Sequence, residues 1–143
     1  MKKSIYNMIL IFLSVILLTA CENYNPIFKP RFKVSNDLVY SKIQKIIKVK
    51  DIHIEGYKIR VDDTIHISLI IRLINPIKLP KNEDSLKLTQ KDVAKETKSL
   101  LKNPLQFKIY NIIFIQRDTV KGIMGRVTSE RSLTHQEFSV KEL

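Results

Sequence analysis

The chain has a single cysteine, no tryptophan and only three glycines among its 143 residues. One cysteine excludes a framework of internal disulfides, and the chain lacks the cysteine cluster of a structural zinc or iron–sulfur site. Scarce glycine excludes a glycine-rich phosphate loop and a dinucleotide-binding fingerprint. The sequence also has no H-E-x-x-H or G-x-S-x-G motif. No motif therefore indicates a catalytic function, and we expect no cofactor.

What the chain does contain begins with an export signal. Met1-Lys2-Lys3 is followed by an apolar run from Ser4 to Ala20 and then by Cys21. A positive start, a short apolar stretch and small residues before a cleavage point are typical of a secretory signal peptide. The run is shorter than the roughly 20 predominantly apolar residues of a spanning helix, and no later stretch is long and apolar enough.

The residues that end at Cys21 are more specific than a general export signal. Leu18-Thr19-Ala20-Cys21 resembles the lipobox of bacterial lipoproteins. The resemblance implies that cleavage follows Ala20, that the Cys21 thiol receives a diacylglycerol and that the new amine is acylated. More than one acyl chain gives a stable membrane anchor, which a single chain does not. The alternatives are an ordinary secretory signal with a free Cys21 and an uncleaved anchor.

The lipobox resemblance implies a protein of the bacterial cell envelope, attached to a membrane through Cys21. Glu22 follows the cysteine in place of the Asp that favours the inner membrane in enteric bacteria. Residues 22–25 also lack the dense acidic run of some surface-exported lipoproteins. We therefore expect the outer membrane, with the protein facing the periplasm, in preference to the inner membrane or the cell surface.

Three parts follow along the chain. Residues 1–20 are the signal peptide, residues 21–34 are the lipidated cysteine and an extended tether, and residues 35–143 are one domain. The aromatic residues of the tether could instead dock on the domain or lie at the membrane interface.

The spacing of apolar residues predicts an α+β domain with two helices. A short helix is expected after Ser35 or Asn36, although its many Ile and Val residues also allow a strand. The main amphipathic helix is expected to begin near Asn82, or at a capping box at Thr89, and to end before Pro104. Its narrow apolar stripe suits a helix that covers one face of a sheet.

Alternating apolar and polar residues, and one stretch at residues 107–116 that is apolar on both faces, predict an antiparallel sheet of about five strands. The expected strands are residues 52–61, 65–74, 107–116, 121–128 and 133–140. Residues 117–119 are expected to turn the chain. Short turns between successive strands favour an antiparallel sheet with the main helix on one face.

The first hairpin has two competing registers. A three-residue loop over residues 62–64 places Ile65 opposite Val61 and Leu69 opposite Tyr57. A bulge at Glu55-Gly56 then corrects the phase, so that Ile71 stands opposite Ile54 and Leu73 opposite Ile52. A two-residue loop instead places Ile65 opposite Arg60 and mixes apolar with charged side chains on one face. Because a shift of one residue exchanges core for solvent, we expect the three-residue loop.

The balance of charge is the one general property with possible functional content. The net charge is +11, and it becomes +9 when residues 1–20 are removed, because Lys2 and Lys3 leave and no acid does. Export away from the cytoplasm excludes nucleic acid as an expected partner and leaves anionic lipids, polymers and acidic proteins. The expected register gathers four candidate anion-binding residues on one face: Lys58, Arg60, His66 and Arg72. Solvated side chains of a lysine-rich protein are the simpler interpretation.

Other chemically active side chains have simple structural interpretations as well. His53 and His66 would stand beside guanidinium groups, which is a poor setting for a metal ion, so we expect no metal site. Asp62-Asp63 fit the local hydrogen bonds of a turn. Glu55, beside the expected bulge, is a slightly better functional candidate, but we name no catalytic residue.

These observations predict a binding or scaffolding module for another envelope component, not an enzyme. The first alternative is a binder or carrier of an anionic lipid or polymer, and the second is a hydrolase without a recognisable motif. A pocket that joins an acid to a histidine would favour the hydrolase, and an exposed apolar groove would favour the protein binder. A convergent Lys/Arg patch would favour the polyanion binder.

Overall fold

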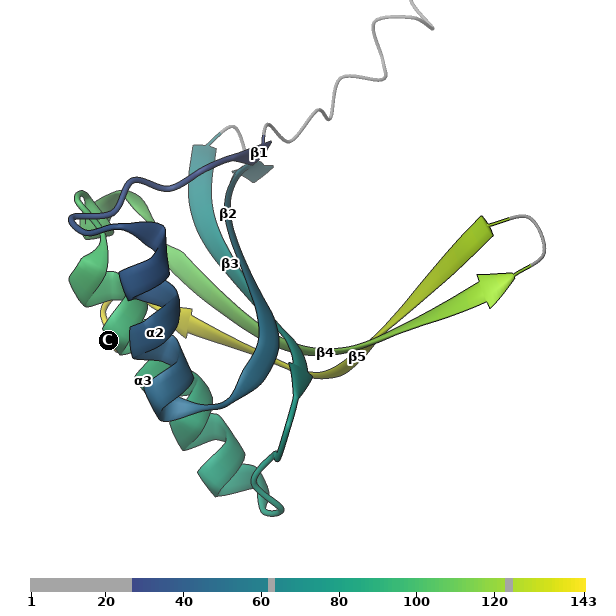
Figure 1. Ribbon diagram of the computed structural model, residues 1–143. Coiled ribbons are helices and arrows are strands. Elements are labelled where there is room, and N and C mark those ends of the chain that lie inside the picture. Colours follow the sequence, from purple (N-terminus) through teal and green to yellow (C-terminus); the bar gives the residue numbers. More distant parts are fainter. Residues whose placement is uncertain (1–26, 62–63, 123–124) are drawn as a thin grey trace, which may run out of the picture.

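The computed structural model describes residues 27–61, 64–122 and 125–143. They form a five-stranded mixed sheet in the order β1-β2-β3-β4-β5, with two α-helices on one side of it (Figure 1). This architecture agrees with the expected α+β class. The elements in chain order are β1 (Ile27–Phe28), α2 (Asn36–Ile46), β2 (Val49–Val61), β3 (Thr64–Pro76), α3 (Glu83–Leu100), the 3-10 helix η1 (Pro104–Gln106), β4 (Ile109–Gly122) and β5 (Gly125–Ser139).

Both helices begin at side-chain caps. The Ser35 hydroxyl accepts a hydrogen bond from the N–H of Leu38, and Asn82 Oδ1 accepts one from the N–H of Ser85. Such caps satisfy N–H groups that have no partner within the first turn of a helix. The main helix thus begins at the earlier of the two expected starts and ends at Leu100.

The expectation of a purely antiparallel sheet is wrong, because β3 and β4 run parallel. The connection between them is α3, whose 18 residues span about 27 Å at 1.5 Å per residue. That length returns the chain from the end of β3 towards its beginning, so Ile109 at the start of β4 stands opposite Ser68. Parallel neighbours require a crossover of this kind, whereas the other neighbouring pairs are antiparallel.

The β2–β3 hairpin has the two-residue loop, so the expected register near the loop is wrong. Val61 stands opposite Thr64, and Arg60 stands opposite Ile65. The described pairs continue in one register, and this part of the chain has no bulge at Glu55-Gly56. Ile65 is 58% exposed, so the loop end of the hairpin lies outside the core. The alternation of apolar and polar residues at this end does not reflect burial, so it predicted the wrong register.

The last two strands are longer than alternation predicts. Strand β4 continues through residues 117–119, which were expected to turn, and β5 is one strand where two were expected. The final rung of this hairpin pairs Gly122 with Gly125, and a shift in the pairing lies between Phe114 and Ile115. Residues 117–119 are polar because this part of the hairpin is partly or fully exposed, not because the chain turns there.

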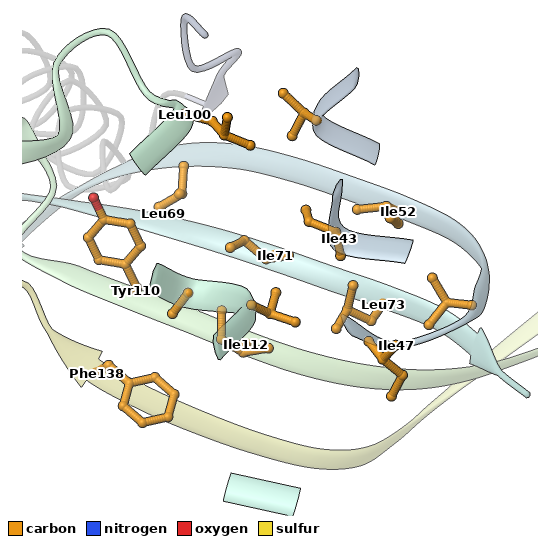
Figure 2. Close-up of a cluster of buried hydrophobic side chains, with 14 of the residues drawn as sticks. Ile43, Ile47, Ile52, Leu69, Ile71, Leu73, Leu100, Tyr110, Ile112 and Phe138 are labelled. Carbon is orange, nitrogen blue, oxygen red and sulfur yellow. The ribbon is translucent and has the colours of Figure 1, made fainter. Parts of the chain in front are cut away.

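The hydrophobic core lies between the helices and one face of the sheet (Figure 2). Its fully buried helical residues include Val39 and Ile43 of α2 and Val93 of α3. The sheet contributes Ile52, Leu69, Ile71, Leu73, Tyr110, Ile112, Phe114 and Phe138. The buried Gln90 amide donates to the Ile112 carbonyl at 3.1 Å, so this polar side chain is satisfied within the core.

The segment before α2 is docked on the domain. The Phe28 ring covers Gly56 so closely that a Cβ at this position would collide with it, and it stacks on Phe107 with ring centroids 6.1 Å apart. The Lys33 N–H donates to the Leu100 carbonyl at 2.8 Å. Within the expected tether, residues 27–34 thus lie on the domain, as the aromatic residues allowed. Residues 1–26, with the expected signal peptide and Cys21, lie outside the described residues.

Candidate functional site

The sheet has a second face, which lies on the side away from both helices (Figure 1). Ile52 and Ile54 of β2 contact the core, so the alternate residues Asp51, His53, Glu55 and Tyr57 belong to the second face. Residues that stand opposite each other in the register share a face with them. We call this surface the open face, and its polar residues include Asp51, His53, Glu55, Tyr57, His66, Arg72, Asn111, Arg117, Glu130 and His135.

Glu55, Tyr57 and Arg72 form a closed hydrogen-bonded network on the open face. Arg72 donates to a Glu55 carboxylate oxygen through Nη1 and to the Tyr57 hydroxyl through Nη2, the latter at 3.0 Å. The Tyr57 hydroxyl donates to the same Glu55 oxygen at 3.0 Å. The guanidinium carbon also lies 5.9 Å from the centre of the Tyr57 ring, within cation–π range. Each side chain therefore holds the other two in place.

The network keeps its acid and its base charged. Burial raises the pKa of the Glu55 carboxyl, but hydrogen bonds from Arg72 and Tyr57 outweigh burial, and the pKa lies below its ordinary value. Burial lowers the pKa of Arg72, but its hydrogen bonds with Tyr57 and Glu55 outweigh burial, and that pKa lies above its ordinary value. Glu55 and Arg72 thus present a fixed pair of opposite charges at neutral pH.

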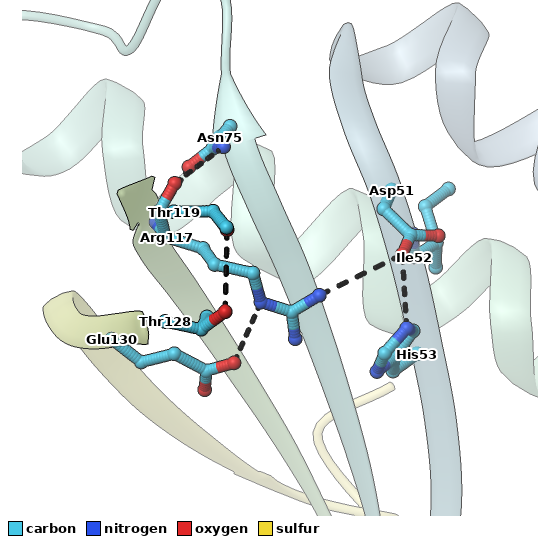
Figure 3. Close-up of polar contacts among 8 residues, drawn as sticks. All are labelled: Asp51, Ile52, His53, Asn75, Arg117, Thr119, Thr128 and Glu130. Carbon is cyan, nitrogen blue, oxygen red and sulfur yellow. Dashed lines mark hydrogen bonds and ion pairs between the residues drawn. The ribbon is translucent and has the colours of Figure 1, made fainter. Parts of the chain in front are cut away.

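A second polar cluster connects β2 to the middle of the β4–β5 hairpin (Figure 3). Asp51 Oδ2 lies 2.9 Å from His53 Nε2 and 3.9 Å from Arg117 Nη1. Arg117 in turn donates through Nε to Glu130 Oε1 at 2.6 Å. Acids and bases therefore alternate across this part of the open face, and neither sign of charge dominates.

The Asn75 side chain binds the backbone of β4 just beyond the last pair between β3 and β4. Its side-chain oxygen accepts from the Arg117 N–H at 2.6 Å, and its side-chain nitrogen donates to the Arg117 carbonyl at 2.9 Å (Figure 3). Asn75 has a φ of 51°, a left-handed conformation that asparagine adopts more readily than most residues. The Asn75 amide thus pairs with the backbone N–H and carbonyl of Arg117, as a neighbouring strand would.

The structure separates the four residues that were expected to bind an anion together. Their partners across the hairpin are Ile67 for Lys58, Ile65 for Arg60, Ile59 for His66 and His53 for Arg72. Positions 58 and 60 therefore belong to the face of Ile65 and Ile67, whereas His66 and Arg72 belong to the open face. The prediction that these four residues share one basic face is therefore wrong, because it depended on the three-residue loop. Anion binding by the individual residues stays a prediction.

A groove of about 500 Å³ lies at the edge of the sheet, between β2, the beginning of α2 and the docked segment before it. We call it the edge groove. It combines apolar side chains with polar ones, including Phe28, Phe32, Tyr40, His53, Ile54 and Glu55. Within the described residues, β1 pairs with Gly56 and Tyr57 alone among the 13 residues of β2, so most of this strand edge has no neighbouring strand.

The edge groove contains both features that were to distinguish a hydrolase from a protein binder. It brings His53, which contacts Asp51, next to Glu55, and it has apolar walls. Its lining residues in the described chain include no serine, threonine or cysteine to serve as a nucleophile. In the same described ranges, no group of three or more His, Cys, Asp or Glu side chains could hold a metal ion.

A smaller groove of about 370 Å³ lies at the other end of α2. It is lined mainly by apolar side chains, including Ile46, Ile77 and Leu79, with two lysines at its rim. It contains no acid and no histidine, so its chemistry is that of an apolar contact surface.

Sequence reasoning missed Tyr57 and Asn75. The expected three-residue loop assigned Tyr57 to the core face opposite Leu69, whereas it stands opposite Ser68. Adopting the two-residue loop would have placed Tyr57, Glu55 and Arg72 on one face and identified the network. Asn75 had no comparable signal, because it was assigned only to the end of a strand.

The part of the chain that the structure describes contains no helix with the length and apolar character needed to cross a bilayer. Comparison with known proteins gives no match to a family model, to a curated protein or to a solved structure.

Proposed function

We propose that this chain is a lipid-anchored protein of the bacterial cell envelope, facing the periplasm from the outer membrane. Its domain acts as a binding module for another envelope protein, and the edge groove with the adjoining open face is the binding site. The observation that carries this proposal is the Glu55–Tyr57–Arg72 network beside the groove. Tyr and Arg held in a fixed geometry are typical anchors of protein interfaces.

The balance of charge in this region favours a protein partner over an anionic polymer. A polyanion that reached Arg72 would also meet the carboxylates of Glu55 and Asp51, which would repel it. A protein surface can match acids and bases that alternate, and such matching provides specificity. The apolar walls of the groove supply the surface that a partner would bury.

The edge of β2 adds a mode of recognition. An extended segment of a partner can add a strand to a free sheet edge, with main-chain hydrogen bonds for affinity and side-chain pockets for specificity. Here the free edge of β2 runs along the groove, so a segment paired with β2 would place its side chains against Phe28 and Ile54.

Photo-crosslinking of the full chain in its native cells tests the binding site. A photoreactive residue at Ile27, which lines the groove and is 60% exposed, should give an adduct of one defined mass. The matched control is Leu88 on α3, which is also 60% exposed. Arg72→Ala should reduce the adduct at Ile27 strongly, and Arg72→Lys, which keeps the charge, should reduce it less. The same adducts at Ile27 and Leu88 would contradict the proposed site.

The anchor is tested separately. Cys21→Ser should abolish labelling by a fatty-acid probe and block maturation of the precursor, because the thiol is the proposed site of acylation. Ala20→Gly keeps a small residue before the cysteine and should be labelled as the unmodified chain is. Unchanged labelling of the Cys21→Ser variant would refute the anchor.

A hydrolase is the second candidate function, because the contact between His53 and Asp51 favours it. Asp51 can orient the His53 ring, which could then activate water as a general base in the edge groove. His53→Gln should abolish such hydrolysis of an ester panel and leave the adduct at Ile27 in place. Hydrolysis that survives in the His53→Gln variant would remove this candidate.

A further inference from the structure

Beyond the region where β4 contacts β3, the β4–β5 hairpin continues as a two-stranded arm that projects away from the helices (Figure 1). The last described pair between β3 and β4 is Ile74 with Ile115, and Asn75 holds Arg117. We call the described residues 118–121 and 126–129 the arm. At about 3.4 Å per residue, β4 extends roughly 17 Å past Arg117. A two-stranded ribbon of this kind is marginally stable by itself.

The charges on the arm are paired at its base and unpaired near its tip. Arg117 forms an ion pair with Glu130 at the base. Lys121 stands opposite Arg126 near the tip, and like charges in directly opposite positions are unfavourable. Among the residues that the structure describes, no carboxylate forms an ion pair with either cation. An anionic partner would relieve this repulsion.

The tip also carries apolar surface. Val120 and Val127 stand opposite each other and are 65% and 66% exposed. Because successive side chains of a strand point to opposite faces, the valine pair and the basic pair occupy the two faces of the same short ribbon. A short ribbon with cations on one face and apolar side chains on the other matches the boundary between the anionic headgroups and the acyl chains of a bilayer.

We propose that the tip of the arm binds the surface of a lipid bilayer that contains anionic phospholipid, with Lys121 and Arg126 on the phosphates. The proposal rests on the proposed anchoring through Cys21. Five residues separate Cys21 from Ile27, and the six Cα–Cα steps between them span at most about 22 Å. The anchor would therefore hold β1, and the domain with it, close to a bilayer surface.

A second copy of the chain suits this tip less well than a bilayer does. Two arms paired through their tips would bring four cations together where two already repel each other. The described arm offers Asp118 as an acid, but Asp118 lies towards the base, where it accepts a hydrogen bond from Gln116 at 3.1 Å.

The test uses the full mature chain, purified with its lipid and reconstituted into vesicles. Because the chain contains no tryptophan, Val127→Trp places a single reporter at the tip, and Leu88→Trp places a matched reporter on α3. With vesicles of phosphatidylcholine and phosphatidylglycerol, emission at position 127 should shift to the blue and be quenched by brominated lipid. Emission at position 88, and at position 127 in pure phosphatidylcholine, should change much less.

Charge variants identify the cause of the signal. Lys121→Ala with Arg126→Ala should reduce the equilibrium constant for tip binding about 30-fold, since each cation near an anionic surface contributes roughly a factor of five. The exchange Lys121→Arg with Arg126→Lys keeps both charges and should keep the signal. Higher salt should weaken the signal of the unmodified tip, because exposed charges are screened beyond about 10 Å at 0.1 M.

Flotation of the same samples distinguishes failure of the arm from failure of the anchor. Flotation with neutral vesicles reports the anchor, whereas the fluorescence at position 127 reports the arm. Equal spectra at position 127 in anionic and neutral vesicles would overturn the proposal for the arm, as would a signal that the alanine variants leave unchanged. An acidic protein or a second copy that protects position 127 without vesicles would overturn it as well.

Discussion

Strand β4 has different surroundings in its two halves. Residues 109–115 lie between β3 and β5, whereas the described part of the chain places only β5 beside residues 118–122. Tyr110, Ile112 and Phe114 in the first half are fully buried under the helices, and Val120 in the second half is 65% exposed. One continuous strand thus belongs both to the core of the fold and to a projecting arm.

This difference indicates which residues stabilise the domain and which are available for contacts. Burial of apolar side chains is the main favourable contribution to folding, so the first half of β4 must contribute far more stability than the second. A valine that remains exposed contributes little to folding, so Val120 and Val127 are available for contacts such as the proposed one with a bilayer.

Substitution in the two halves should separate them most clearly. Phe114→Ala removes a fully buried aromatic side chain and should lower the free energy of unfolding by about 3–5 kcal/mol. Val120→Ala should change it by no more than roughly 0.5 kcal/mol, as substitutions at exposed positions do. Urea denaturation of the two variants measures both values, and similar losses would show that the arm is packed.

The junction of the two halves should give an intermediate effect. Asn75→Ala removes both hydrogen bonds to the Arg117 backbone and leaves these partly buried groups unpaired, at a cost of about 1–3 kcal/mol. Asn75→Gly is the matched control, because glycine accepts the φ of 51° without strain but lacks the amide. Denaturation should show losses for both variants. Full stability of Asn75→Gly would assign the role to backbone conformation alone.

The open face should give the smallest effect, and one that depends on pH. The pKa of Glu55 lies below its ordinary value, so its ionised form contributes stability above the unfolded pKa of about 4.3. That contribution is lost as the pH falls through the lower folded pKa. The difference in unfolding free energy between the unmodified chain and Glu55→Gln should therefore be largest near neutral pH and shrink below about pH 4.3.

Glu130→Gln is the control for this pH dependence. Glu130 pairs with Arg117 at the base of the arm and is exposed, so the substitution should change stability by less than about 1 kcal/mol. Denaturation curves between pH 2 and 7 compare the two variants on one scale. A difference for Glu55→Gln that stays constant over this range would show that the carboxylate charge does not stabilise the network.

Sequence patterns predicted the elements of the core well. Asn82, at the earlier of the two expected starts, caps helix α3, and the predicted pairs Ile54 with Ile71 and Ile52 with Leu73 are present in the hairpin. These positions were predictable because burial imposes alternation and helical spacing on them. Tertiary contact enforces the pattern there, and the pattern therefore reports the structure.

Patterns failed where the chain leaves the core. The loop end of the β2–β3 hairpin and the arm are exposed, so no burial enforces alternation, and polar residues 117–119 resembled a turn. The parallel pairing of β3 and β4 depends on the length of α3 relative to the strands, a relation between elements that no local pattern contains. The Glu55–Tyr57–Arg72 network was missed for the same reason, because only the correct register of the β2–β3 hairpin places its three residues on one face.

Hydrogen exchange along β4 tests most directly the claim that the arm serves contacts and not folding. Among amides that pair with a neighbouring strand, we expect those of residues 110–114 to exchange only through global unfolding. The amides of residues 119–121 should exchange much faster through local opening, and anionic vesicles should slow their exchange. Uniform protection along the whole strand, unchanged by vesicles, would contradict the division of β4 into a core half and an arm.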